Sequence, residues 1–169
     1  PAEAQTVPPV RVHERLSCRD RPGCRVPRED KHAVAQRGRQ QQTWLHLVSG
    51  NLFRACPAVL ARRLLNAGEA DTGVLCCEAY DTDAVTQFLR PYDDLTLSVS
   101  LLADGSMEKE VVGSIAQSLT LPQDRCRVAE IFRAPSSQMV SFTLTEQGTA
   151  VQPAETAARG PAPLEPPPA

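Results

Sequence analysis

Cysteine provides the most reactive side chains in this chain of 169 residues, which contains six of them. Cys56 is followed by Pro57, and proline is favoured at the first position of a helix because its missing N–H would have no partner there. The free amides and the positive dipole end of such a helix lower a thiol pKa and stabilise the thiolate. The spacing therefore indicates Cys56 as a candidate redox cysteine, and a structural or disulfide-bonded cysteine is the alternative interpretation.

Cys18 and Cys24 lie close together in the sequence, so a disulfide bond between them would close a short loop in an oxidising compartment. Two free thiols are the alternative. A zinc site would need two further ligands at suitable spacing, and His13 and His32 do not complete a recognised set. We therefore expect no metal site in this segment.

Cys76 and Cys77 are adjacent, so in a strand their side chains would point to opposite faces. At most one of them would then line the core, and the other would be available for a disulfide bond. Cys126, at the start of a later predicted strand, is a reasonable partner for either. Six cysteines allow three bridges in fifteen connectivities, and the sequence does not choose among them.

Other residues that could do chemistry lack the neighbours that they would need. His46 has no Gly-x-Ser-x-Gly elbow to accompany it, so a hydrogen-bonded strand histidine is the preferred interpretation. The acidic groups at 81–83 and 93–94 lack the glycine and the distal glutamate of a calcium loop, so helix capping and solvation explain them better. We find no glycine-rich phosphate loop, and no metal or cofactor is expected.

The elements that would position these residues begin with a strand at 43–48. A helix is expected at 56–66, with Gly68 as its stop. A short apolar strand follows at 74–80, and a further helix is expected at 83–90. Together they predict strands that alternate with helices.

The second half of the chain shows the clearest alternation of apolar and polar residues. It predicts half-buried strands at 95–101 and from Val140 onward. Between them, apolar residues spaced by four predict a helix after the turn at 104–106, closed by Pro122, with another strand at 126–133. The residues spaced by four are Val111, Ile115 and Leu119.

The predicted fold class is α+β, a mixed sheet with helices packed on it in the order β-α-β-α-β-α-β-β. The domain would span 43–146. Residues 1–42 are rich in arginine and turn formers and are expected to form an extended arm. Residues 147–169 form a proline-rich tail that is expected to be polyproline-like or disordered.

The β-α-β-β stretch at 95–146 resembles the SEA-like, ferredoxin-like modules of secreted algal and protist proteins. The resemblance depends on Leu121-Pro122-Gln123-Asp124-Arg125 ahead of Val128 and on Val140-Ser141-Phe142. Some of those modules cleave themselves at Gly-Ser. The corresponding turn, at 134–139, lacks the glycine, so no self-cleavage is expected.

Cys56-Pro57 resembles the start of the active-site helix in thioredoxin-like proteins. The resemblance implies a redox role for Cys56. Two positions depart from the pattern. Val59 stands where a dithiol protein would have its second cysteine, and no proline opens the strand at Leu95, where that family has a cis-proline.

Charge is distributed unevenly along the chain. Residues 1–63 carry 12 basic and 5 acidic side chains, whereas the remainder carries 6 and 15. This asymmetry indicates an arm that meets an acidic surface or nucleic acid, or that folds onto the acidic half of its own kind of chain. A solvated arm is the alternative. No aromatic residues are interleaved to stack on bases. The candidate interaction residues of the arm are Arg11, Arg15, Arg19, Arg21, Arg25 and Arg28.

These observations favour a non-enzymatic structural or interaction subunit whose arm and tail bind other protein subunits of an assembly. A thiol-dependent redox protein that uses Cys56 is one alternative, and a nucleic-acid-binding subunit of an organellar ribosome-like setting is another. No apolar run approaches the length needed to span a bilayer. The chain does not begin with methionine, so it is expected to be processed, and no targeting segment indicates a compartment.

Overall fold

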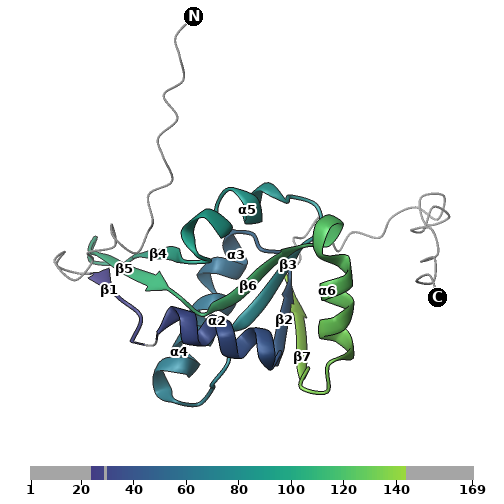
Figure 1. Ribbon diagram of the computed structural model, residues 1–169. Helices are drawn as coiled ribbons and strands as arrows, with labels where there is room; N and C mark the ends of the chain where they lie inside the picture. Colours follow the sequence, from purple (N-terminus) through teal and green to yellow (C-terminus); the bar gives the residue numbers. More distant parts are fainter. Residues whose placement is uncertain (1–23, 29, 144–169) are drawn as a thin grey trace, which may run out of the picture.

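The computed structural model describes residues 24–28 and 30–143 (Figure 1). At its centre is a four-stranded parallel sheet in the order β6-β3-β2-β7. β3 is buried along its whole length, which explains why its sequence is an almost continuous apolar run rather than an alternating one. The four strands are β2 (Trp44–Leu47), β3 (Val74–Glu78), β6 (Ile115–Thr120) and β7 (Met139–Phe142).

Helices cover both faces of the central sheet. Three helices between β2 and β6 contribute to one apolar core cluster, and the last helix contributes to another on the opposite face, beside β6 and β7 (Figure 1). Alternate residues of β3 enter the two clusters, as the pleat of a strand requires. The helices are α3 (Asn51–Ala55), α4 (Pro57–Ala67), α5 (Asp83–Thr86) and α6 (Leu121–Arg133).

A second, three-stranded sheet in the order β1-β5-β4 lies beside the first. It contains β1 (Cys24–Arg25) and the antiparallel hairpin of β4 (Thr96–Leu101) and β5 (Met107–Val112). Gly105 in the hairpin turn has a φ of 81°, which glycine adopts without steric cost. Two further elements complete the described fold, namely α2 (Lys31–Gln40), which packs against β6, and the short helix η2 (Arg90–Tyr92).

The order of the central strands identifies where a ligand would bind. The chain steps from β2 to β3 to β6 in one direction and then crosses back to place β7 on the other side of β2. This is the 3-2-1-4 order that begins the doubly wound α/β fold. Ligands of such sheets bind at the carboxyl edge where the strand order reverses. In this chain that point lies between β2 and β7.

The structure confirms several sequence predictions. The strands expected at 43–48 and 74–80 are β2 and β3, and the helix expected at 56–66 is α4. Gly68 ends α4 in the left-handed conformation, with a φ of 74°. The described part is therefore an α/β domain with a parallel sheet, although the central sheet is not mixed as predicted.

The predictions for 106–133 are wrong. The expected helix is β5 followed by β6, and the expected strand at 126–133 belongs to α6. Apolar residues spaced by four also fit two strands joined by a short turn, here Gly113-Ser114. Pro122 lies in the first turn of α6, where proline is tolerated, and does not close a preceding helix.

The ends of the chain give a divided outcome. An extended arm was expected through residue 42, but 31–40 forms α2, where the Asp30 side chain accepts a hydrogen bond from the His32 amide at 2.9 Å. This is a regular N-cap, so the prediction is wrong for this segment. The rest of the arm before residue 24 and the tail at 147–169 lie outside the described residues.

In the described part of the chain, no helix has the length and apolar character that crossing a bilayer requires.

Candidate functional site

The turn between β2 and α3 forms the centre of the carboxyl edge. Val48 follows β2 with a φ of 76°, and its amide donates a hydrogen bond to the carbonyl of Cys77 at 2.8 Å. Ser49 is completely buried. Gly50 precedes α3, and a Cβ placed there would meet nothing within 4 Å. The turn thus has open space beside its glycine, whereas Val48 is hydrogen-bonded to β3 and Ser49 is buried.

Glu78, the last residue of β3, connects this turn to the loop that follows β3. Its Oε2 accepts hydrogen bonds from the Ser49 amide at 2.8 Å and the Ser49 hydroxyl at 3.0 Å. Its Oε1 accepts from the amides of Ala79 at 3.1 Å and Tyr80 at 3.2 Å. Burial alone would raise the pKa of Glu78, but the hydrogen bonds outweigh it and hold that pKa below its ordinary value. The buried carboxylate is therefore ionised at neutral pH.

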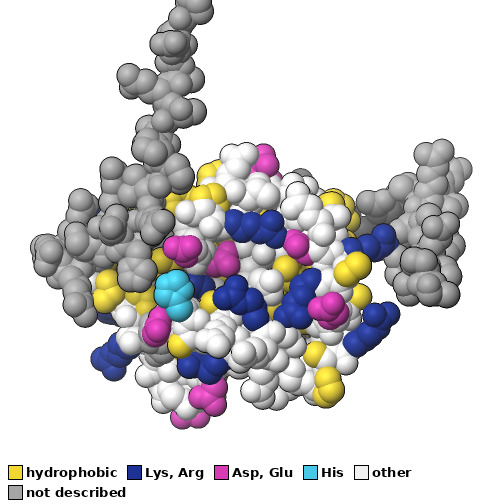
Figure 2. Space-filling model, in the orientation of Figure 1, with side chains coloured by type: hydrophobic (Ala, Val, Ile, Leu, Met, Phe, Trp, Pro, Cys, Tyr) yellow, Lys and Arg dark blue, Asp and Glu magenta, His cyan; other side chains and the backbone are white. Residues whose placement is uncertain are grey.

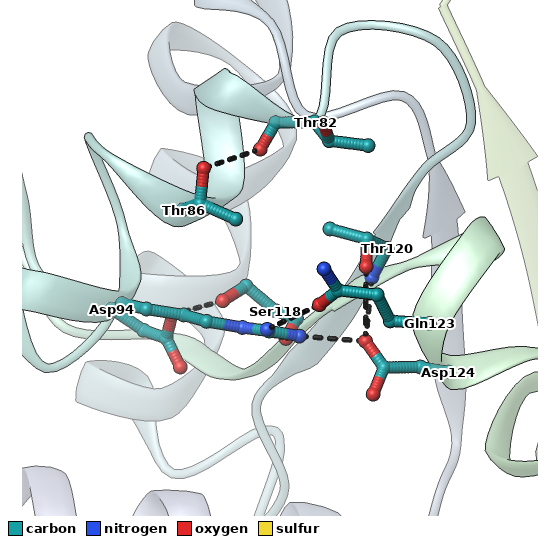
Figure 3. Close-up of polar contacts among 8 residues, drawn as sticks. Thr82, Thr86, Asp94, Ser118, Thr120, Gln123 and Asp124 are labelled. Carbon is teal, nitrogen blue, oxygen red and sulfur yellow. Dashed lines mark hydrogen bonds and ion pairs between the residues drawn. The ribbon is translucent and has the colours of Figure 1, made fainter.

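A second polar network fixes the carboxyl end of β6 (Figure 3). The Arg90 guanidinium pairs with the Asp124 carboxylate at 2.6 Å and donates to the carbonyl of Ser118. Asp124 also accepts the amide of Thr120 at 2.8 Å. Burial opposes ionisation of Asp124, yet these hydrogen bonds and Arg90 lower its pKa. The network holds the start of α6 against the η2 segment and gives this end of the sheet a fixed shape.

A cavity of about 560 Å³ lies at the switch point, between α4 and the β2–β7 pair. Ser141 Oγ accepts a hydrogen bond from Trp44 Nε1 at 2.7 Å and lies 2.8 Å from His46 Nδ1. His46 stacks on Phe53, with ring centroids 4.6 Å apart, and burial lowers its pKa. Its Nε2 is buried without a hydrogen-bond partner among the described residues. The expectation of a strand histidine is met, but only one of its two nitrogens is satisfied.

Cys56, the candidate redox cysteine, is exposed at the junction of α3 and α4 and lines the same cavity. Cys56, Cys76, Cys77 and Cys126 carry free thiols, so the disulfide bonds predicted among these four residues are absent. Cys76 and Cys77 do lie on opposite faces of β3, but helices cover both faces and both side chains are buried. Neither is available for pairing. Cys18 lies outside the described residues, so its predicted disulfide bond with Cys24 stays a prediction.

The predicted interaction arm falls mostly outside the described residues, because Arg11, Arg15, Arg19 and Arg21 precede residue 24. Arg25 lies in β1 and pairs with Glu108 at 2.8 Å, and Arg28 is exposed. On the face that Figure 2 shows, basic and acidic side chains are interspersed. That face therefore lacks the one-signed surface that a nucleic acid backbone requires.

Sequence reasoning missed the two features that define the edge. It singled out neither the turn at Ser49 and Gly50 nor Glu78 as part of a candidate site. A signal was present in the order of the elements. A nucleotide-binding unit typically has a strand, a glycine-containing turn, a helix and then a second strand that ends in an acidic residue. Within the described residues, no group of three or more His, Cys, Asp or Glu side chains could hold a metal ion.

Comparison with known proteins identifies enzymes. No family model matches the chain. It is 36% identical over 129 residues to the D-mannonate oxidoreductase of Thermotoga maritima and 30% identical over 130 residues to the uncharacterized oxidoreductase YeiQ of Escherichia coli. These matches cover 75% and 76% of this chain but 24% and 25% of the relatives. The chain thus spans about a quarter of the length of the curated relatives that it matches.

Two solved structures share the fold. They are a substrate-free D-sorbitol dehydrogenase, with a TM-score of 0.63 and 20% identity, and Pseudomonas fluorescens mannitol 2-dehydrogenase in a ternary complex with NAD and D-mannitol, with a TM-score of 0.64 and 24% identity. Each match covers 75% of this chain and 25% of the other chain.

These findings correct both family resemblances and the functional interpretations drawn from the sequence. The resemblances to SEA-like, ferredoxin-like modules and to thioredoxin-like proteins are wrong, because the similar proteins are a D-mannonate oxidoreductase and a related oxidoreductase and the central sheet of this chain is parallel in the order β6-β3-β2-β7. The interpretation as a non-enzymatic structural subunit is wrong for the same reason, as are its alternatives of a Cys56 redox protein and a nucleic-acid-binding subunit.

Proposed function

We propose that this domain is the dinucleotide-binding part of an NAD-dependent oxidoreductase that acts on a polyol or a sugar acid. The observation that carries the proposal is the 36% identity over 129 residues to a D-mannonate oxidoreductase. The 3-2-1-4 strand order supports it, since that order provides a crevice for a dinucleotide between β2 and β7. Bound NAD would supply the hydride acceptor.

The residues at the edge fit the adenosine half of NAD in two places. Gly50 leaves open space beside the β2–α3 turn, so a pyrophosphate could approach the backbone closely. Past the end of β3, Asp81 and Asp83 are exposed, and a carboxylate in this loop typically accepts the ribose hydroxyls. We assign the ribose contact to these two residues, because the acceptor sites of Glu78 are occupied.

Two residues depart from the G-x-G-x-x-G pattern, Val48 at its first glycine and Phe53 at its third. A turn of this kind normally begins with glycine, and this chain has Val48 there. The departure at Val48 concerns the backbone conformation of the turn and leaves the open space at Gly50 intact. Of the described residues, we assign none as a catalytic acid or base. The contribution of this chain is to bind and orient the cofactor.

Calorimetric titration of the chain with NAD⁺ tests the proposal. We expect saturable binding of NAD⁺ and of ADP-ribose, because both carry the adenosine ribose and the pyrophosphate, and much weaker binding of nicotinamide mononucleotide. A matched control is Asp104→Asn, which changes an exposed carboxylate in the distant β4–β5 hairpin and should leave the affinity unchanged. Absence of saturable NAD⁺ binding up to millimolar concentrations would overturn the proposal.

A further inference from the structure

Val48 adopts a backbone conformation that its side chain disfavours. Its φ of 76° lies in the left-handed region, where a β-branched residue is a genuine outlier and glycine is the usual choice. Something in the surrounding structure must therefore stabilise this conformation. The turn follows directly after β2, so its strain would bear on the edge where the strand order reverses.

The amides on both sides of the strained position are anchored by β3. The Val48 amide donates to the Cys77 carbonyl at 2.8 Å. The Ser49 amide, one peptide further on, donates to the Glu78 carboxylate, and the Ser49 hydroxyl adds a second bond to the same oxygen. The two anchors bracket both backbone dihedrals of Val48. The carboxylate anchor depends on a side chain, so it can be removed by substitution.

Glu78 has no remaining capacity for a ligand. Each of its oxygens accepts two hydrogen bonds, which fills the roughly four acceptor positions of a carboxylate. The side chain is only 3% exposed, and it forms no ion pair with a described cation. Its position at the end of β3 would suit a ribose-binding acid, but its bonding leaves it an internal role.

We infer that Glu78 is a positioning residue that replaces a missing glycine: its carboxylate holds the β2–α3 turn in the left-handed geometry that Val48 would otherwise leave. The loss of Glu78 should then release the turn only while valine occupies position 48. The consequence for cofactor binding rests on the function proposed above, whereas the coupling between the two residues does not.

The test is a double-mutant cycle of Glu78→Gln and Val48→Gly. Glutamine keeps the size of the side chain, but its NH₂ group cannot accept, so only one of the two loops keeps an acceptor. Glu78→Leu, which accepts for neither loop, is therefore taken through the same cycle and decides the outcome for the turn. We expect Glu78→Gln to weaken NAD⁺ binding about tenfold and to lower the denaturation midpoint. Val48→Gly should bind at least as tightly as the parent. The double variant should recover to within about threefold, because glycine needs no anchor.

Glu110→Gln is the matched control. This half-buried carboxylate of β5 pairs with Arg62 of α4, outside the turn, so its loss should lower stability with no rescue by Val48→Gly. Additive effects of Glu78→Leu and Val48→Gly on the denaturation midpoint would overturn the inference. If the parent chain does not bind NAD⁺ at all, the proposed function fails. The inference would then be decided by the denaturation cycle alone, where non-additivity supports it.

Discussion

His46 and Ser141 are hydrogen-bonded across the point where the strand order reverses, with 2.8 Å between Nδ1 and Oγ. Ser141 also accepts from Trp44, and its hydroxyl hydrogen has no other acceptor in the described residues. In the tautomer that carries its proton on Nε2, the hydroxyl donates to Nδ1. Nε2 is buried without a hydrogen-bond partner among the described residues, and His46 lines the cavity at the switch point.

Substituting Ser141 with alanine should destabilise the chain by about 1–3 kcal/mol, because both Trp44 Nε1 and His46 Nδ1 lose their partner in a partly buried site. Chemical denaturation measures the change. The control is Ser100→Ala on β4, where the side chain is exposed. This variant should lower the free energy of unfolding by less than about 0.5 kcal/mol. Equal costs for the two variants would contradict the assignment of Ser141 as a shared partner.

The pH dependence of stability should carry the signature of Glu78. Its pKa in the folded chain lies below the ordinary 4.5, so the folded state binds fewer protons than the unfolded state. The contribution of Glu78 is complete above pH 4.5 and is lost as the pH falls through the lowered pKa. Denaturation midpoints from pH 7 to pH 3 should therefore fall less steeply for Glu78→Gln than for the parent.

The control for this profile is Glu130→Gln, which removes an exposed carboxylate from an ion pair on α6. Exposed pairs of this kind contribute little to stability, so this variant should follow the parent profile. Parallel acid profiles for the parent and Glu78→Gln would show that the hydrogen bonds of Glu78 do not favour its ionised form.

Thiol reactivity should divide the cysteines by burial. Cys56 and Cys126 are exposed and should be alkylated in the native chain without prior reduction. Burial raises the pKa of Cys76 far above its ordinary value and that of Cys77 to about 11, so both should react only after unfolding. Mass spectrometry of native and denatured samples measures this. Failure of Cys126 to react without a reductant would indicate a disulfide bond.

The sequence predicts the segments whose periodicity has one interpretation. Apolar runs predict the strands at 44–47 and 74–78. The helix at 57–67 follows from Pro57, because proline is favoured at the first helical position, and from Gly68, because glycine is favoured just after the last one. The segment at 107–120 has an ambiguous period, because a spacing of four fits both one helix and two strands. The pairing of β6 with β3 decides in favour of two strands. That pairing is a tertiary contact, so the local sequence does not show it.

The candidate site was harder to predict because this chain departs from the common motif. Val48 stands at the first glycine position of the G-x-G-x-x-G pattern, so the sequence does not match the motif by which a phosphate-binding turn is recognised. The compensation by Glu78 lies thirty residues away along the chain, and it becomes visible only when β2 and β3 are paired. A departure that is repaired through tertiary contacts leaves little local signal.

Cofactor choice is the last expectation, and it depends on the proposed dinucleotide site. Asp81 and Asp83 are exposed carboxylates directly after β3, so the additional 2′-phosphate of NADP⁺ would meet like charge there. We expect NADP⁺ to bind at least about tenfold more weakly than NAD⁺. The double variant Asp81→Asn/Asp83→Asn should narrow the difference to about threefold, mainly by improving NADP⁺ binding. A preference that persists unchanged in this variant would assign the discrimination to other residues.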